Sequence, residues 1–545
     1  MCIRDRKYRF QWNFPIVFSR HNPKRLYTFS NHVHVTENQG QSWDIISPDL
    51  TRNDPERLKS SGGPITQDNT GVEYYCTIFA ADESPLQEGL LWVGSDDGLI
   101  HLTRDGGKNW SNVTPKNMPQ WMMINSVDPS PFDPGTCYVA GTRYKMGDFR
   151  PYLYKTTDYG ATWEKIDHGI PNEHFTRVVR ADPAKKGLLY AGTENGMYVS
   201  FNDGQLWEPF QQNLPLVPIT DLTIKDNSLI VATQGRSLWM IDDLTVLHQL
   251  SSSNTPQLYQ PKATYRFGGR GGKTSLTAGT NLANGVNVHF YLPTFDTASD
   301  SLSIAFLEED GTLIKRFSTT DKKNPLEVTK GGNTLLWNMR YDGPERLKGM
   351  ILWGASLGGA KAVPGSYKVQ MTLNDQTMTK PFAILPRPDS EATIEDMQAQ
   401  FDFVEDINTT IDQAHKAIKN IRLLNKKLKD FQSQYADQTA TKTLREQAKS
   451  LEEALTEIEK TLYQTQNRSN QDPLNFPIKL TNKLGHLTNL VMMGDFGPTA
   501  QDMAVRDEMT TKINDQLDRY NSLLNQEVKA FNTAFKSLAL DYLMD

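Results

Sequence analysis

The chain has 545 residues, of which 38% are hydrophobic and 10% aromatic, and a formal net charge of −6 at neutral pH. Several domains are expected at this length, because single hydrophobic cores rarely extend beyond about 250–300 residues. The mild charge argues against a nucleic-acid groove, and no apolar run reaches the roughly 20 residues of a membrane helix. Three cysteines, Cys2, Cys76 and Cys137, imply no disulfide framework, and the histidines show no zinc spacing, so neither metal nor cofactor is expected.

One eight-residue turn occurs four times between residues 36 and 207, with the pattern Ser/Thr-x-Asp/Asn-x-Gly-x-x-Trp. After the Ser or Thr, its fixed residues are Asn38, Gly40 and Trp43; Asp105, Gly107 and Trp110; Asp158, Gly160 and Trp163; and Asn202, Gly204 and Trp207. The Asp or Asn side chain is expected to accept hydrogen bonds from backbone N–H groups one or two residues further on, and glycine allows a backbone conformation that a side chain penalises. The tryptophan ring is expected to anchor the hairpin to the layer beneath it.

The repeated turn resembles the Asp-box of β-propellers, and its spacing matches the blades of such a fold. They begin at residues 36, 103, 156 and 200, and a four-stranded blade takes about 40–50 residues, so the longer intervals carry insertions, at 47–71 and 143–151. A last strand pair from Leu229 keeps the strand pattern without the turn, as terminal repeats do. We therefore expect residues 7–248 to form a partial propeller of about five blades.

The pattern changes to alternating strands after residue 256. Strands are expected near residues 286, 302, 333 and 364, separated by turn residues at all-β spacing. Residues 258–388 are therefore predicted to form an immunoglobulin-like β-sandwich.

The last part of the chain carries apolar residues at intervals of three and four. One continuous stripe runs from Ile394 to Tyr435, and further stripes cover 444–462 and 505–538, with a short segment between residues 473 and 494. The first helix should be roughly 60 Å long. Because none of these stripes is buried alone, residues 389–545 are predicted to form an antiparallel helical bundle.

The repeated turn resembles the Asp-box, or bacterial neuraminidase repeat, of β-propellers. Together with the segments ISPDLTRNDPERL from Ile46, WVGSDDGL from Trp92 and GRSLWMIDD from Gly235, it resembles large bacterial sortilin-like proteins, which are often described as glycosyl hydrolases. This resemblance implies a secreted, periplasmic or cell-surface protein whose earlier blades lie upstream, so that the chain is a carboxyl-terminal portion. Residues 1–6 lack the apolar core of a secretory signal, which is then also expected upstream.

Candidate site residues are sought where the inner strand of each blade begins, since these residues surround one mouth of the channel. The inner strands are expected to start near residues 73, 121, 174 and 220. The candidates for ligand binding there are Trp121, His174 and Arg177, and Arg143 and Tyr144, in the insertion at 143–151, are expected to reach over the same face.

A glycosidase needs two carboxyl groups, about 5–5.5 Å apart for retention or about 6.5–9.5 Å apart for inversion. Asp68 or Glu73, together with Asp221, are the candidate acids, although such residues also commonly cap turns or pair with arginines. The sequence Asp96-Asp97-Gly98 is interpreted as a hairpin turn rather than a calcium site.

A sialidase needs arginines that hold a carboxylate, and Arg143, Arg150 and Arg177 are the only cluster available in the propeller. Ordinary ion pairs are the favoured interpretation of these three residues.

The favoured function is a binding or scaffold module that recognises a polypeptide or a glycan across the propeller face. The alternative is a glycoside hydrolase with an acid pair in the propeller cleft. A convergent carboxylate pair with one raised pKa would indicate hydrolysis, whereas a shallow aromatic face around Trp121 would indicate binding.

Overall fold

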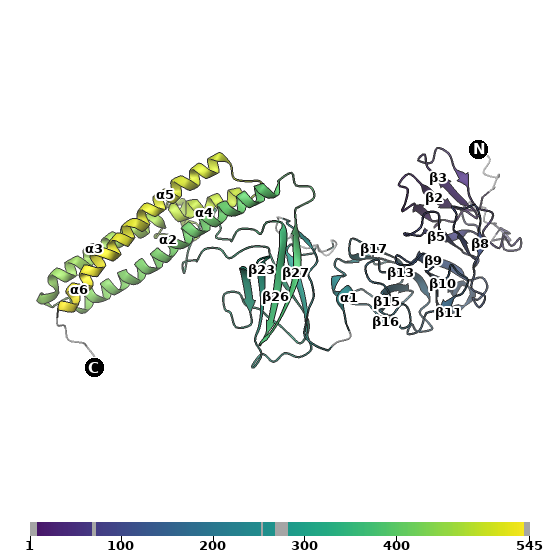
Figure 1. Cartoon of the computed structure of the whole chain (residues 1–545), viewed down its shortest axis with the longest axis horizontal. Coiled ribbons are helices and arrows are strands. Elements are labelled where there is room, and N and C mark those ends of the chain that lie inside the picture. The colour runs from purple at the N-terminus through teal and green to yellow at the C-terminus, as the bar shows by residue number, and fades with distance from the viewer. Residues whose placement is uncertain are drawn as a thin grey trace. The chain divides into compact units, whose positions relative to one another are not determined.

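A computed structural model describes residues 8–60, 62–67, 72–251, 254–267, 279 and 282–538. The chain divides into two compact units, Met1–Leu250 and Ser251–Asp545. The first unit is built from strands, and the second combines two sheets with long helices (Figure 1).

The first unit contains five antiparallel sheets, which we number blades 1 to 5. Blades 1 to 4 have four strands each, paired in chain order, and blade 5 has three. The strands are β1 (Ile16–Phe18), β2 (Leu26–Phe29), β3 (Val33–Thr36) and β4 (Asp44–Ile45) in blade 1; β5 (Ile78–Glu83), β6 (Leu91–Ser95), β7 (Ile100–Thr103) and β8 (Ser111–Asn112) in blade 2; β9 (Met123–Pro129), β10 (Cys137–Arg143), β11 (Asp148–Thr156) and β12 (Glu164–Lys165) in blade 3; β13 (Thr176–Ala181), β14 (Leu189–Thr193), β15 (Gly196–Ser200) and β16 (Glu208–Pro209) in blade 4; and β17 (Ile219–Lys225), β18 (Ser228–Thr233) and β19 (Leu238–Ile241) in blade 5.

The first strands of blades 2 to 5 lie side by side. β5 contacts β9, β9 contacts β13 and β13 contacts β17, and Figure 1 shows these strands following one another through the unit. They are the inner strands of the arc, and they begin within a few residues of the positions expected from the sequence. After β19 a short helix, α1 (Thr245–Gln249), ends the unit.

All four repeat turns share one hydrogen-bonding pattern. In the turn of blade 2, the Thr103 hydroxyl donates to Asp105 and accepts from the Gly107 backbone N–H, each at 2.9 Å. The Asp105 carboxylate also accepts from the backbone N–H of Asn109, at 2.9 Å. The other three turns repeat these bonds. The main backbone donor therefore lies four residues beyond the Asp or Asn, not one or two as expected, because the turn residues curl back around this side chain.

The tryptophan of each later turn binds the blade before it. The indole N–H of Trp110 donates to the carbonyl of Ile46, Trp163 donates to Val113, and Trp207 donates to Ile166, at 2.8, 2.7 and 2.5 Å. Each acceptor lies three residues after the preceding turn's tryptophan. These three tryptophans thus link consecutive blades, rather than anchoring a hairpin to a layer beneath it.

The second unit contains two sheets that enclose one core. The first has the order β20-β22-β25 and the second the order β21-β27-β26-β23-β24. In the core between them Phe306 stacks on Trp337, and Phe382 meets both rings edge-on. The strands are β20 (Gln257–Leu258), β21 (Thr264–Tyr265), β22 (Val286–Leu292), β23 (Leu302–Glu308), β24 (Leu313–Ser318), β25 (Gly331–Trp337), β26 (Gly365–Leu373) and β27 (Gln376–Leu385). The immunoglobulin-like topology expected from the sequence stays a prediction.

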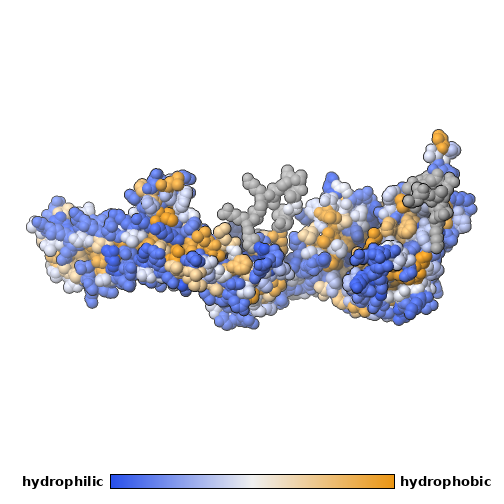
Figure 2. Space-filling view, turned by 90° about the horizontal axis from the view of Figure 1, so that it is seen from above, coloured by the Kyte–Doolittle hydropathy of each residue, from blue (hydrophilic) through white to orange (hydrophobic). Residues whose placement is uncertain are grey.

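Long helices follow these sheets, and their apolar stripes share one core. They are α2 (Ile394–Gln434), α3 (Lys442–Leu462), α4 (Leu480–Val491), α5 (Ala500–Leu523) and α6 (Lys529–Ser537). The expected last helix is interrupted by a π-helical turn at Leu524–Val528. Figure 2 shows a mostly hydrophilic surface along these helices, as expected when their apolar stripes face inward. No helix in the described ranges is both long and apolar enough to cross a membrane.

Buried polar contacts join the sheets of the second unit to its helices. Arg266 is 1% exposed, and its guanidinium pairs with Asp495 and donates to Gln400 on α2. In the glycine-rich loop before β26, the Trp353 backbone N–H donates to Asn482 on α4 at 2.8 Å. The sheets and the helices therefore pack as one unit.

The inter-blade tryptophan contacts predict unequal effects of tryptophan removal. Trp207 is 1% exposed, so Trp207→Ala should lower the free energy of unfolding of the propeller unit by about 3–5 kcal/mol. Trp43, in the first turn, is 41% exposed and should cost less than about 1 kcal/mol when replaced by alanine. Urea unfolding followed by circular dichroism compares the two variants, and equal losses would contradict the assignment of these contacts.

Candidate functional site

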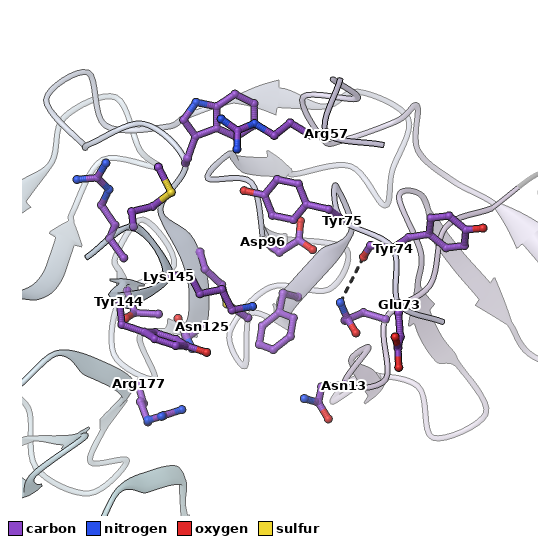
Figure 3. Close-up of a pocket in the computed structure, with 17 residues that line it drawn as sticks. Asn13, Arg57, Glu73, Tyr74, Tyr75, Asp96, Asn125, Tyr144, Lys145 and Arg177 are labelled. Carbon is purple, nitrogen blue, oxygen red and sulfur yellow. Dashed lines mark hydrogen bonds between the residues drawn. The ribbon is translucent and has the colours of Figure 1, made fainter. Parts of the chain in front are cut away.

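A cavity of about 600 Å³ lies where the inner strands of blades 2 to 4 begin. Its walls come from the segments before β5 and β9, the start of β13, and the ends of β6 and β10 (Figure 3). This is the mouth of the channel at which the sequence predicted binding residues.

One wall of the cavity is an aromatic stack around Trp121. Its indole lies nearly parallel to the ring of Tyr75, with centroids 6.2 Å apart, and the guanidinium groups of Arg57 and Arg52 lie 4.5 and 5.0 Å from its centroid. Trp121 also has a left-handed backbone, with φ of 62°. Because these neighbours cover it, Trp121 is only partly exposed and presents less open aromatic surface than its sequence position suggested.

The second aromatic wall is formed by Tyr144, in the short helical turn Tyr144–Met146 between β10 and β11. Its ring stacks on Phe175 with centroids 5.1 Å apart, and Arg177 lies over both rings. Tyr144 remains 36% exposed. Stacked rings of this kind offer a flat apolar surface with a polar edge.

Polar atoms without hydrogen-bond partners line the space between the two walls. They are Oδ1 of Asn125, Oγ1 of Thr142 and Nε of Arg143, each shielded from solvent and without a partner in the part of the chain that the structure describes. Thr142 is only 2% exposed. Buried polar groups are normally hydrogen-bonded, so these three atoms keep unused hydrogen-bonding capacity just beneath the cavity surface.

A buried carboxyl group, Asp96, lies between Tyr75 and Lys145 in the same cavity (Figure 3). It is 5% exposed and accepts hydrogen bonds from the backbone N–H and the hydroxyl of Thr77, both at 2.8 Å. Burial raises its pKa to about 7, against the effect of the Thr77 bonds, and the neighbouring Asp97 raises it further. Asp96 therefore exchanges its proton near neutral pH.

Asp96 occupies the turn that the sequence predicted, but its place in the cavity was missed. In blades 2 to 4 the second strand carries Gly-Ser or Gly-Thr near its end, and the residue after this pair is Asp96, Arg143 or Glu194. Asp96 and Arg143 line the cavity, and Glu194 pairs with Arg177, which also lines it. Comparing this position across the repeats was the signal that could have identified Asp96.

Most of the residues predicted from the sequence meet in this cavity. Trp121, Arg143, Tyr144, Arg177 and Glu73 all line it. Glu73 lies apart from Asp96, on the side of Tyr74, and accepts a hydrogen bond from the indole of Trp12 at 2.9 Å (Figure 3).

One further candidate, His174, lies elsewhere. His174 is not among the lining residues, and its Nδ1 is hydrogen-bonded to the Tyr198 hydroxyl at 2.7 Å. Asp68 falls outside the described residues.

Asp221 lines a different pocket, of about 360 Å³, at the opposite ends of the inner strands. There it pairs with Arg180 at 2.9 Å, beside Asp82 and Asp128. Burial raises the pKa of Asp128 to about 6. The acid pair of Glu73 and Asp221 considered from the sequence therefore does not form, because the inner strands separate the two carboxylates.

The three arginines considered for a sialidase site are held in ion pairs. Arg143 and Arg150 both contact Asp148, at 3.0 and 2.9 Å, and Arg177 pairs with Glu194 at 2.6 Å. The hydrogen bond from Arg150 is the main reason that the pKa of Asp148 is lowered. Only Arg143 and Arg177 line the cavity, so the three guanidinium groups do not converge.

Within the described ranges no three His, Cys, Asp or Glu side chains are grouped as a metal site. Cys76 and Cys137 are buried and unpaired, and burial raises the pKa of the Cys76 thiol to about 12. Neither thiol is therefore ionised near neutral pH.

Comparison with known proteins finds xyloglucanases, although no family model matches the chain. It is 24% identical over 182 residues to the probable oligoxyloglucan-reducing end-specific xyloglucanase of Neosartorya fischeri, a match that covers 33% of this chain and 20% of that protein. A xyloglucanase of Acetivibrio thermocellus is 25% identical over 142 residues, covering 22% and 17%. The chain thus spans a fifth or less of the length of these curated relatives.

Solved structures with a similar fold include a GH74 xyloglucanase from Xanthomonas campestris, with a TM-score of 0.33 and 13% identity, covering 51% of this chain and 42% of that one. YCF48 bound to D1 peptide has a TM-score of 0.27 and 20% identity, covering 40% and 62%. Part of the chain is thus similar in sequence to xyloglucanases, and its first unit is built from β-sheets.

The raised pKa of Asp96 predicts a specific pH dependence of stability. Between its ordinary value of 3.8 and about 7 the folded state keeps a proton that the unfolded chain releases, so stability falls as pH rises through this interval. The Asp96→Asn variant should not show this fall. Its free energy of unfolding relative to that of the wild type should therefore increase by up to about 1.4 kcal/mol per pH unit. Urea unfolding at about pH 4 and about pH 7 tests this, and a stability difference that does not change with pH would contradict it.

Proposed function

We propose that the cavity between Trp121 and Tyr144 binds a glycan. The observation that carries this proposal is the set of buried, unpartnered polar atoms of Asn125, Thr142 and Arg143 between two aromatic stacks. Ligand sites typically combine apolar walls with a few polar groups that fix the ligand's orientation.

The chemistry of these atoms favours a ligand rich in hydroxyl groups. Oδ1 of Asn125 only accepts a hydrogen bond, Nε of Arg143 only donates one, and the Thr142 hydroxyl does both. Sugar hydroxyls both donate and accept, so they match all three kinds of group once the ligand displaces the side chains that cover these atoms. The flat C–H face of a sugar ring packs on the exposed ring of Tyr144.

The curated relatives direct the choice of glycan. Their names describe xyloglucanases, including one specific for the reducing end of oligoxyloglucan, and we propose xyloglucan oligosaccharides as the ligand class. In this proposal the chain is part of a sortilin-like, extracytoplasmic protein, organised as an Asp-box propeller at 7–248, an immunoglobulin-like sandwich at 258–388 and a helical bundle at 389–545. The last two parts act as a scaffold for the propeller.

The first test removes single hydrogen-bonding and stacking groups. Thr142→Val keeps the side-chain shape but removes the hydroxyl, and should weaken the binding of xyloglucan oligosaccharides about 2- to 10-fold. Tyr144→Ala should weaken binding by a similar factor, and Thr157→Val, at an exposed position outside the cavity, should have no effect. Isothermal titration calorimetry measures all three, and unchanged affinity in both cavity variants, or binding of unrelated peptides instead, would refute the proposal.

Hydrolysis is the second candidate, favoured by one observation. A buried carboxyl group with a pKa of about 7 is suited to protonate a leaving group near neutral pH, and Glu73 is the other acid in the same cavity. This candidate requires loss of activity in Asp96→Asn by a factor of about 100 or more.

Under the binding proposal the chain should release no new reducing ends from xyloglucan oligosaccharides. Prolonged incubation followed by a reducing-end assay tests this. Release that Asp96→Asn abolishes and Thr157→Val retains would replace the binding proposal with hydrolysis.

A further inference from the structure

The cross-strand registers identify which side of each blade faces the preceding blade. In blades 2, 3 and 4 the residue opposite the first residue of the repeat turn is Leu91, Cys137 or Leu189. Each is at most 1% exposed and belongs to a core shared with the blade before it. In blade 1 the equivalent residue is Leu26, opposite Thr36.

On this side of blade 1 an apolar surface is exposed. Ile16 and Phe18 pair with Thr28 and Leu26, and Ile45 pairs with His34, so their side chains share one face of the sheet. Ile16 is 62% exposed, Phe18 65% and Ile45 44%. Trp43, 41% exposed, completes this surface, which we call the Trp43 face and define by Ile16, Phe18, Leu26, Trp43 and Ile45.

The turn that contains Trp43 has the same internal hydrogen bonds as the three later turns, which contact a preceding blade. The Thr36 hydroxyl accepts from the Gly40 backbone N–H at 3.0 Å, as in the later turns. Yet the Trp43 indole N–H has no partner among the described residues, whereas the other three indoles each donate to the preceding blade.

The surroundings of the turn glycine also differ between blade 1 and the later blades. A methyl group added at Gly107, Gly160 or Gly204 would come within 2.6 Å of Ile46, Val113 or Ile166 of the preceding blade. These glycines therefore allow the close approach of two blades.

At Gly40 the three nearest atoms among the described residues all belong to Trp43 itself, at 3.7 Å or more. The space that a preceding blade fills at the other turns is thus open here.

We propose that the Trp43 face binds a further blade of the same repeat type. The further blade has a repeat turn of its own, and the third residue after the tryptophan of that turn is aliphatic. The side chain of this residue packs on Gly40, and its main-chain carbonyl accepts from the Trp43 indole N–H. The three interfaces within the chain show that this one combination, an aliphatic side chain and a free carbonyl, satisfies both requirements.

A second copy of this chain does not offer that combination at its other end. Blade 5 has no repeat turn and no fourth strand, because α1 follows β19. It therefore lacks the element that supplies the acceptor carbonyl in blades 1 to 3, and a blade with a complete repeat turn is the matching partner.

The test supplies such a blade from this chain. A second copy of residues 121–175, which contain blade 3 and its connection to blade 4, replaces residues 1–14 in the full chain. This removes Tyr8 and Phe10, which contact His34 on the same side of blade 1, and places the copied Ile166 next to Trp43.

In the fused chain, Trp43→Ala should lower the unfolding midpoint clearly more than the same substitution does in the original chain. Its effect should equal that of Trp110→Ala in the original chain. Acrylamide quenching of the Trp43 fluorescence, taken as the difference from Trp43→Phe, should fall on fusion. As the matched control, Ile166→Lys in the copied blade alone should restore the small effect of Trp43→Ala.

An equal effect of Trp43→Ala in the fused and original chains, with unchanged quenching, would overturn the proposal. If the one-blade fusion does not fold, a fusion carrying residues 72–175 decides, since its copied blades 2 and 3 keep their own interface. Self-association of the original chain that Trp43→Ala abolishes in sedimentation would also overturn it, in favour of a second copy. None of these measurements involves glycan binding, so they stand apart from the test of the proposed function.

Discussion

The contact between a turn tryptophan and a carbonyl of the preceding blade is the interaction on which the rest of the propeller depends. Its two halves have different origins. The turn itself is local, since a Ser or Thr, an Asp or Asn and a glycine bind one another within eight residues. The acceptor lies about 40 to 65 residues earlier in the chain, at Ile46, Val113 or Ile166. The local turn thereby positions its tryptophan to bind a sheet that is distant in the sequence.

This contact between blades brings the ends of the second strands together at one mouth of the channel. Asp96 and Arg143 come from equivalent positions in consecutive blades, yet they meet in one cavity. Packing of the blades also removes solvent from this region, which raises the pKa of Asp96 and leaves Thr142 and Asn125 shielded without partners. The cavity's chemistry is therefore a consequence of blade packing more than of any single strand.

The second unit is held together by a different kind of interaction. Its helices bury long apolar stripes against one another, and a buried arginine, Arg266, joins them to the sheets through Asp495 and Gln400. Burying a charged group is costly unless it is paired, so this contact requires the sheets and α2 to keep one arrangement. In the propeller, the turn tryptophans make repeated contacts between blades, and buried carboxyl groups such as Glu83, Asp97 and Asp182 lie within the same unit.

Elements with a short-range period followed from the sequence alone: the four turns, and helices expected over 394–435 and 444–462, which the structure has at 394–434 and 442–462. Repeat spacing also placed Trp121 and Arg177 at the starts of inner strands, and the insertion at 143–151 placed Arg143 and Tyr144 over the same face. Tertiary structure alone decided that Asp96 belongs to the cavity, that Asp221 lies at the opposite end, and that the tryptophans bind neighbouring blades. Turns and amphipathic stripes depend on residues a few positions apart, whereas burial, pKa and side-chain convergence depend on segments that meet only when the blades pack.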